Sequence, residues 1–203
     1  MDSTQSRQDY FNDLSGRWDG FTDGERVRMA LRKALSTVSI DQEEHVVDLG
    51  CGTGNLTSVL TEILGPGGTI TAVDFSGAMI EVARNKVRDP RVRWLVADAA
   101  RLPLEDASID RVICFSAWPH FPDPSAAARE LFRILRPGGM LHILHINSRE
   151  SINAVHGGVG GAIGHDVLPS ARDLAGVLRA CGFDVCEEVD TDTAYRVAGE
   201  KVV

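Results

Sequence analysis

The stretch VVDLGCGTGN, residues 46–55, runs from an apolar, β-rich segment straight into a helical pattern. Glycines at positions 50, 52 and 54 let the backbone turn tightly and let a ligand approach without a Cβ in the way. Open α/β sheets bind their ligands at such junctions, beyond the carboxyl ends of the strands. A dinucleotide fingerprint needs G-x-G-x-x-G, but here position 55 is Asn and the third glycine is at 54. The stretch therefore predicts a ligand site on a glycine turn of a different spacing.

Short β-rich runs alternate with helical patterns on both sides of this turn, which is typical of an α/β domain with a parallel sheet. Helices are expected to start at the capping residues Ser76, Asp123 and Ser170. We predict one doubly wound, mostly parallel seven-stranded sheet, with helices on both faces and a C-terminal antiparallel strand pair. The expected strands are His45–Leu49, Thr69–Val73, Val92–Val96, Asp110–Phe115, Met140–Ile146, Phe183–Val189 and Ala194–Val203.

Length and composition narrow the class of protein. With 203 residues and 43% apolar content, the chain fits one domain, 1–203, with a sizeable core. No run approaches about 18 consecutive apolar residues, so we expect no membrane-spanning helix. The polar start Met1–Tyr10 argues against a secretory signal, and we expect a cytoplasmic protein. The net charge of −8 disfavours binding to nucleic acid or to an anionic membrane.

Three carboxylates lie at or just after the ends of the first three expected strands: Asp48, Asp74 and Asp98. Because the carboxyl ends of parallel strands meet at one edge of a sheet, we expect these side chains to surround the glycine turn. A carboxylate at Asp74 can accept two hydrogen bonds from ribose hydroxyls. NAD-dependent enzymes use an acid in the same place, so Asp74 alone does not choose between families. The third carboxylate, Asp98, disfavours the oxidoreductase alternative.

The D-x-G-x-G-x-G pattern of residues 48–54 resembles the first motif of the class I (Rossmann-like) S-adenosylmethionine-dependent methyltransferases. The resemblance spans residues 10–146 and is nearest to small-molecule methyltransferases related to the quinone-biosynthesis C-methylating enzymes. It implies S-adenosylmethionine as cofactor and S-adenosylhomocysteine as product. In that family the methionine end lies over the glycines, and an Asp at the position of Asp98 accepts from the adenine amino group. The cofactor-binding residues that the resemblance implies are Asp48, Gly50, Gly52, Gly54, Asp74, Phe75, Asp98, Ala99 and Phe115.

Aromatic residues are frequent near the N-terminus, and the resemblance suggests a role for them. Tyr10, Phe11 and Trp18 are expected either to fold over the cofactor as a lid or to pack as ordinary core. The chain is then expected to contain an N-terminal lid or helical segment over 1–40, a cofactor-binding core over 41–146, and an acceptor-side loop with the last two strands over 147–203.

The segment after the fourth expected strand reads FSAWPHF, residues 115–121. Enzymes that methylate amino groups of DNA carry an Asp/Asn-Pro-Pro-Tyr/Phe motif here, which this chain lacks. Methyl transfer is an in-line displacement at an activated carbon, so orientation supplies much of the acceleration. We expect transfer to a small-molecule acceptor. Two alternatives stay open: a methyltransferase fold that holds the cofactor without catalysis, and a protein methyltransferase.

Histidines are the candidate bases, because their pKa lies near working pH. His120 faces the cofactor in the family, where it serves as a base or as a packing residue. His145 lies near the end of the fifth expected strand, on the opposite face from His142. His156 and His165 bracket a segment with five glycines, which we interpret as a mobile cover over the acceptor. The candidate catalytic residues are therefore His120, His145, His156 and His165.

The same histidines suggest a metal site as a second hypothesis. His145, His156 and His165, with Asp166 nearby, could converge on a divalent metal such as zinc or iron. An open coordination position would then take a substrate thiol or oxygen. The alternative is a flexible insertion whose histidines are solvated or bond to the backbone.

Overall fold

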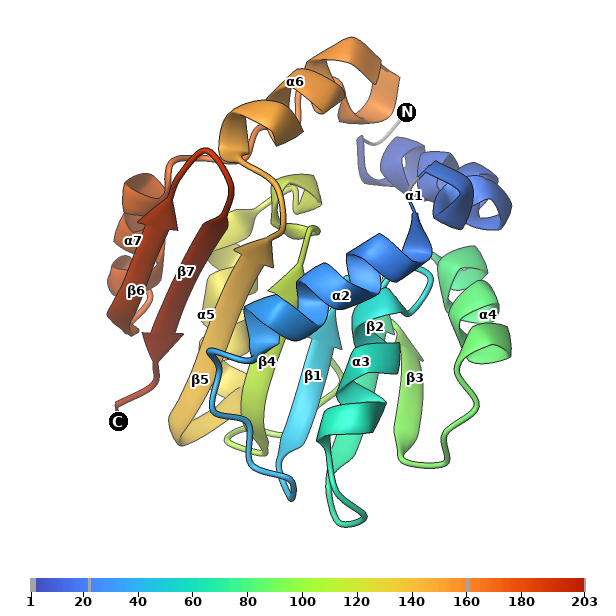
Figure 1. Ribbon diagram of the computed structural model, residues 1–203. Coiled ribbons are helices and arrows are strands. Elements are labelled where there is room, and N and C mark those ends of the chain that lie inside the picture. The colour runs from blue at the N-terminus through green and yellow to red at the C-terminus, as the bar shows by residue number, and fades with distance from the viewer. Residues whose placement is uncertain (1–2, 22, 160, 203) are drawn as a thin grey trace.

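The computed structural model describes residues 3–21, 23–159 and 161–202. A seven-stranded sheet forms its centre, with the strand order β3-β2-β1-β4-β5-β7-β6 (Figure 1). The strands are β1 (His45–Leu49), β2 (Thr69–Asp74), β3 (Val92–Val96), β4 (Ile109–Phe115), β5 (Leu135–His145), β6 (Asp184–Asp190) and β7 (Tyr195–Glu200). The helices are α1 (Ser3–Leu14), α2 (Gly24–Leu35), α3 (Asn55–Ile63), α4 (Gly77–Lys86), α5 (Pro124–Ile134), α6 (Arg149–Val159) and α7 (Ala171–Ala180). Short 3-10 turns are η1 (Ser15–Phe21), η2 (Trp118–His120) and η3 (Gly161–Ile163).

The sheet is parallel except around β7. β1 pairs in parallel with β2 and β4, β2 with β3, and β4 with β5. β7 runs antiparallel to both of its neighbours, β5 and β6. The strand order reverses between β1 and β4, and such a switch point opens a crevice beyond the carboxyl ends of the strands. The predicted sheet is confirmed, including its antiparallel C-terminal strand pair.

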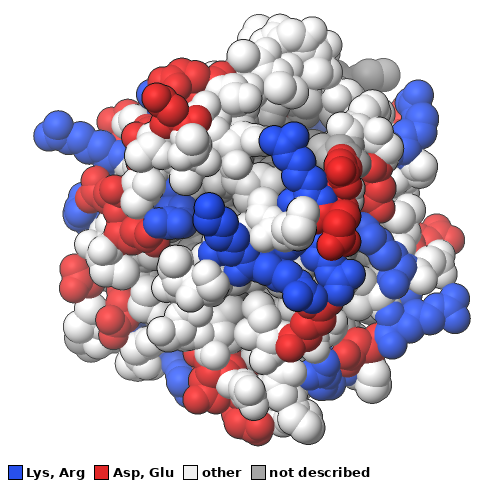
Figure 2. Space-filling model, viewed as in Figure 1, with Lys and Arg blue, Asp and Glu red and all other residues white. Residues whose placement is uncertain are grey.

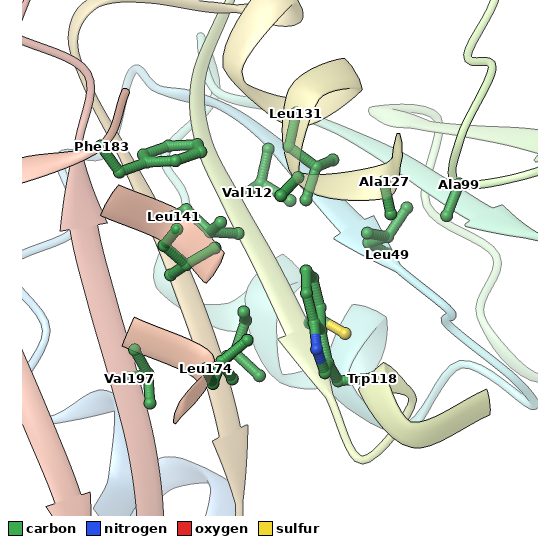
Figure 3. Close-up of a cluster of buried hydrophobic side chains, with 14 of the residues drawn as sticks. Leu49, Ala99, Val112, Trp118, Ala127, Leu131, Leu141, Leu174, Phe183 and Val197 are labelled. Atoms are coloured by element: carbon green, nitrogen blue, oxygen red, sulfur yellow. The ribbon is translucent and has the colours of Figure 1, made fainter. Parts of the chain in front are cut away.

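Helices cover both faces of the sheet. α2 and α3 pack on one face through residues such as Leu31 and Leu60. α5 and α7 pack on the other, where Leu131 and Leu174 belong to the same buried cluster as Leu141 of β5 (Figure 3). All five of these leucines are buried, and truncating one of them to Ala would cost about 2–5 kcal/mol. This two-sided packing holds the strands in register and so fixes where their carboxyl ends lie.

Three helices begin at the predicted capping residues. The side chains of Ser76, Asp123 and Ser170 each accept a hydrogen bond from a first-turn backbone N–H, at 3.1, 2.8 and 3.1 Å. Each bond satisfies a donor that has no partner within its helix. The cap at Ser76 starts α4 two residues after Asp74, so it also shapes the turn around the second strand-end carboxylate.

β5 starts earlier than expected. It begins at Leu135 rather than Met140, because Leu135 pairs with Ile109 before the ladder shifts register. Pro137, Gly138 and Gly139 therefore form an irregular part of the strand rather than a turn that precedes it.

The glycine-rich segment after β5 is largely helical, so the prediction of a loop between His156 and His165 is wrong. α6 runs through His156 and is followed by η3, while Gly160 lies outside the described residues. Glycine in a helix costs about 1 kcal/mol relative to Ala, but tertiary contacts hold this segment. Asn153 bonds both the N–H and the carbonyl of Leu168, at 2.8 and 3.1 Å.

Two segments lie over the carboxyl end of the sheet, α1 with η1 on one side and α6 with η3 on the other (Figure 1). They are called the cover below, and comprise residues 3–21, 149–159 and 161–166. α1 contacts η3, so the two parts of the cover meet above the strand ends. The cover is built from the start of the chain and from the segment between β5 and α7.

The surface carries both charges close together. Figure 2 shows Lys and Arg side chains running across the face that α2 occupies, with Asp and Glu beside them. Arg28 and Arg32 of α2 both pair with Glu62 of α3.

Among the helices of residues 3–21, 23–159 and 161–202, none combines the length and the apolar character that a bilayer crossing needs.

Candidate active site

The glycine turn between β1 and α3 adopts left-handed backbone conformations. The φ angles of Gly50, Gly52 and Gly54 are +70°, +52° and +82°, a region that favours glycine. A Cβ on Gly50 would lie only 2.3 Å from the Cβ of Ala117 in the loop after β4. A Cβ on Gly52, in contrast, would enter open space. The turn thus brings the ends of β1 and β4 into contact and leaves room above Gly52.

Asp74 ties the end of β2 to this turn. Its Oδ2 accepts from the backbone N–H of Gly52 and its Oδ1 from that of Ser76, both at 2.9 Å. Burial raises the pKa of Asp74, and these backbone hydrogen bonds oppose the rise. Each carboxylate oxygen retains a second acceptor position for a ligand.

Asp48 is the most deeply buried carboxylate of the turn, with 1% of its surface exposed. The Thr57 hydroxyl donates to its Oδ2 at 2.5 Å, while Oδ1 has no hydrogen-bond partner among the described residues. Burial raises the pKa of Asp48 to about 7, the Thr57 bond opposes this, and the charge of Asp74 adds to it. An unpaired, buried carboxylate oxygen at a pocket wall suits a cationic ligand.

One pocket joins the strand ends, and all but one of the nine implied cofactor residues line it. Phe75, Ala99 and Phe115 contribute apolar surface, and the exposed Asp98 lies at the end of β3. Gly54 does not line the pocket. Gly54 is instead the N-cap residue of α3, in a left-handed backbone conformation. A Cβ at this position would lie 3.2 Å from the Cβ of Ala83, so close packing rather than ligand contact explains the glycine.

Polar side chains tie the N-terminal part of the cover to the pocket rim. Gln8 donates to the backbone carbonyl of Phe75 at 2.7 Å. Asp19 accepts from the Thr53 hydroxyl at 2.6 Å and from the Lys86 ammonium at 2.8 Å. No sequence signal pointed to these contacts, because single polar residues in an N-terminal segment are ordinary.

Phe11 and Trp18 line the pocket from the cover. The Phe11 ring lies 5.6 Å from that of Phe75 and 5.1 Å from that of His120, measured between centroids. Tyr10 packs edge-on against Phe11 and is not among the lining residues. Phe11 and Trp18 thus pack together and also line the pocket, whereas Tyr10 only packs against Phe11, so the two expectations do not exclude each other.

His120 lines the same pocket and is held by a buried carboxylate. Its Nδ1 lies 2.8 Å from Oδ2 of Asp166, and Arg7 donates to Oδ1 of Asp166 at 2.5 Å. Burial acts to raise the pKa of Asp166, but hydrogen bonds from His120 and Arg7 outweigh it and lower that pKa. The Nδ1 of His156 lies 2.9 Å from the backbone carbonyl of Asp166. The sequence carries no signal for Arg7, and it suggests Asp166 only as a metal ligand.

The other predicted histidines lie outside the pocket lining. His145 is 3% exposed, and burial, then the charges of His120 and His156, lower its pKa to about 3. Its ring packs edge-on against Tyr195 at 5.6 Å. His142 lies on the opposite face of β5 from His145, as expected, beside Arg111 at 2.7 Å.

The predicted metal triad does not form. His165 is exposed, whereas His145 and His156 are buried. α6 and η3 replace the expected loop, so the histidines at its two ends do not close on one point. Within the part of the chain that the structure describes, no three His, Cys, Asp or Glu side chains are grouped to hold a metal ion.

The fold and the pocket define a Rossmann-like α/β protein with a pocket at the switch point of the sheet, the place where such sheets bind their ligands. A family model described as a methyltransferase domain matches residues 47–143. Methyltransferase GfsG from Streptomyces halstedii is 32% identical over 190 residues, which cover 89% of this chain and 66% of that protein. Demethylmenaquinone methyltransferase from Staphylococcus aureus is 31% identical over 135 residues, 64% of this chain and 56% of that protein. The chain belongs to the class I S-adenosylmethionine-dependent methyltransferases.

The chain spans between about half and two thirds of the length of these curated relatives. Solved structures match it more completely. A putative methyltransferase in complex with the Haloferax volcanii Trm112 methyltransferase activator gives a TM-score of 0.80 at 23% identity, covering 94% of this chain and 97% of that one. A SAM-dependent methyltransferase from Aquifex aeolicus gives 0.70 at 21% identity, covering 88% and 98%. At these identities the likeness shows the fold.

Proposed function

We propose that this protein transfers the methyl group of S-adenosylmethionine to a small-molecule acceptor by in-line displacement. One observation carries the proposal. The pocket that holds the strand-end carboxylates Asp48, Asp74 and Asp98 is also lined by His120, a potential base. A cofactor site and a proton acceptor therefore share one enclosed space.

The residues of the pocket fit the cofactor. The open space above Gly52 accepts a ligand against the main chain, and the unpaired Oδ1 of Asp48 favours a cationic group nearby. Asp74 would accept from ribose hydroxyls and Asp98 from the adenine amino group. Phe75, Ala99 and Phe115 would supply apolar contacts around the adenosine.

His120 is the proposed base. When bound, the cofactor supplies a methyl carbon activated by a sulfonium leaving group. Transfer of that methyl group to the acceptor would leave S-adenosylhomocysteine as the product. His120 takes the proton that a hydroxyl, amine or carbon acid must lose, a contribution of about 10²–10⁴-fold in rate. Orientation of the acceptor in the pocket supplies the rest of the acceleration.

The enclosure of the base favours a small acceptor. The His120 side chain is 12% exposed, and residues of the cover, including Arg7, Phe11 and Trp18, line the pocket with it. A small molecule can enter such a space whole, whereas a macromolecule must thread a side chain into it. A protein acceptor is therefore the less favoured alternative.

The test combines binding with turnover. S-adenosylhomocysteine binding is measured by calorimetry, and its release from S-adenosylmethionine by mass spectrometry across thiols, phenols, quinols and amines. Transfer to at least one of these acceptors supports the proposal. Binding without transfer to any small molecule or protein contradicts it and favours a non-catalytic module. Transfer only to protein in a cell lysate contradicts the small-molecule assignment.

A further inference from the structure

Asp166 is a junction between three segments that are far apart in the chain. Its side chain is 2% exposed and accepts from Arg7 of α1 through Oδ1 and from His120 of η2 through Oδ2. Its backbone carbonyl accepts from His156 of α6 at 2.9 Å, and its backbone N–H donates to Ile163 of η3 at 3.0 Å. Both its side chain and its main chain are thus held in place.

The chemistry of these contacts fixes the proton on His120. Hydrogen bonds lower the pKa of Asp166, so its carboxylate only accepts. Nδ1 of His120, 2.8 Å away, must then carry the hydrogen. The neutral ring has a single N–H, so Nε2 is the nitrogen left free to accept a proton from a ligand in the pocket. Without Asp166, the ring could adopt the other tautomer or rotate.

The same contacts join the base to the cover. Arg7 belongs to the N-terminal part of the cover and Asp166 to its second part. His120 lies in η2, the short 3-10 turn that follows β4 of the sheet. Arg7 and His120 both line the pocket. Displacement of either part of the cover would therefore separate at least one pair at the junction and release the carboxylate from its position.

We infer that Asp166 is a positioning residue that orients His120, and that closing both parts of the cover completes the base. The inference rests on the proposed function, because it gives the role of Asp166 in the same reaction. Closure of the cover then has two effects at once: it shields the pocket from water and it orients His120 as the proton acceptor.

Imidazole NMR tests the inference without an acceptor. In uniformly ¹⁵N-labelled protein saturated with S-adenosylhomocysteine, the His120 signals are assigned by their loss in His120→Gln. We expect the Nδ1–H tautomer of His120 in the unchanged protein and its loss in Asp166→Ala. Asp192→Ala, at an exposed position in the β6–β7 turn, is the matched control and should leave the tautomer unchanged.

Asp166→Asn keeps the shape of the side chain and serves if Asp166→Ala does not fold. We expect kcat for the best acceptor of the panel to fall at least about tenfold, with little change in KM for S-adenosylmethionine.

Hydrogen exchange tests the link to the cover. We expect S-adenosylhomocysteine to protect α1 and residues 161–166 together, and Arg7→Met to weaken protection in both. An unchanged His120 tautomer in Asp166→Ala, or protection of α1 independent of residues 161–166, would overturn the inference. If S-adenosylhomocysteine fails to bind at all, the proposed function fails first, so the two failures can be told apart.

Discussion

The two halves of the pocket are built in different ways. On the cofactor side, neighbouring strand ends and one glycine turn bring main-chain N–H groups and carboxylates together, as in the pair of 2.9 Å bonds at Asp74. On the acceptor side, the contacts join side chains from remote segments. Arg7 and Asp166 are 159 residues apart, and His120 and Asp166 are 46 apart.

The fold therefore determines the arrangement of the cofactor side, whereas it leaves the acceptor side free to vary. A parallel sheet with a switch point places β-strand ends and their turns in the same arrangement whatever the acceptor. The acceptor side depends on the cover, whose helices can change without disturbing the strands. Binding of the cofactor and choice of acceptor are therefore expected to respond to different substitutions.

The largest effect is expected on the acceptor side. His120→Gln removes the proposed base, so methyl transfer should fall by about 10²–10⁴-fold while S-adenosylhomocysteine still binds. Calorimetry and a turnover assay on the same sample measure the two quantities. His165→Gln, at an exposed histidine, is the matched control and should retain activity. Loss of cofactor binding in His120→Gln would show that the two halves are not separable.

Two glycine substitutions sharpen the comparison within the cofactor half. In Gly50→Ala the added Cβ would clash with Ala117, so the loops after β1 and β4 must move apart. This variant should be destabilised by about 2–4 kcal/mol and lose cofactor binding. Gly52→Ala meets no protein atom within 4 Å, so the strain of its positive φ should cost only about 1 kcal/mol. It should nevertheless weaken S-adenosylhomocysteine binding. Denaturant unfolding and calorimetry distinguish these outcomes, and equal destabilisation of both variants would contradict them.

Asp48 gives the cofactor half a pH dependence. Its pKa is raised to about 7, so the unliganded protein should lose stability as pH rises from about 4 through 7 and the buried carboxyl ionises. Affinity for S-adenosylmethionine, a cation at sulfur, should rise over the upper part of the same range. Asp48→Asn should flatten both trends and weaken binding about 10- to 100-fold at pH 8. Thermal melts and calorimetry between pH 5 and 8.5 measure both trends. A wild-type trend of the opposite sign in either quantity would contradict the prediction.

The smallest effect is expected at the rim, where the cover meets the cofactor half. Asp19→Ala removes the part-buried contact to the Thr53 hydroxyl and the exposed ion pair with Lys86, and exposed ion pairs contribute about 0–1 kcal/mol. S-adenosylhomocysteine affinity should fall only a few-fold, with faster dissociation in stopped-flow. Asp13→Ala, an exposed position on α1, is the control. An effect as large as that of Asp48→Asn would mean that the cover, rather than the glycine turn, dominates binding.

The cofactor half could be predicted from the sequence because its signals are local. The glycines lie within residues 46–55, and Asp74 and Asp98 follow recognisable strands, so the sheet alone brings them together. The acceptor half could not be predicted, because its contacts depend on tertiary structure. α6 forms in spite of its glycines, and no periodicity relates Arg7 to Asp166. His165 was expected at the site on spacing alone, and the helical cover leaves it exposed.

The position of β7 has a consequence for the order of assembly. β7 follows β6 in the chain but lies between β5 and β6, so β6 reaches the sheet only through it. The parallel strands β1 to β5 can pair as they are synthesised, whereas β6 must wait for residues 195–200. We expect the β6–β7 hairpin to form locally and to dock on β5 as a unit, since local pairing closes the smaller loop. His145, opposite Tyr195 on β7, would be buried in that last step.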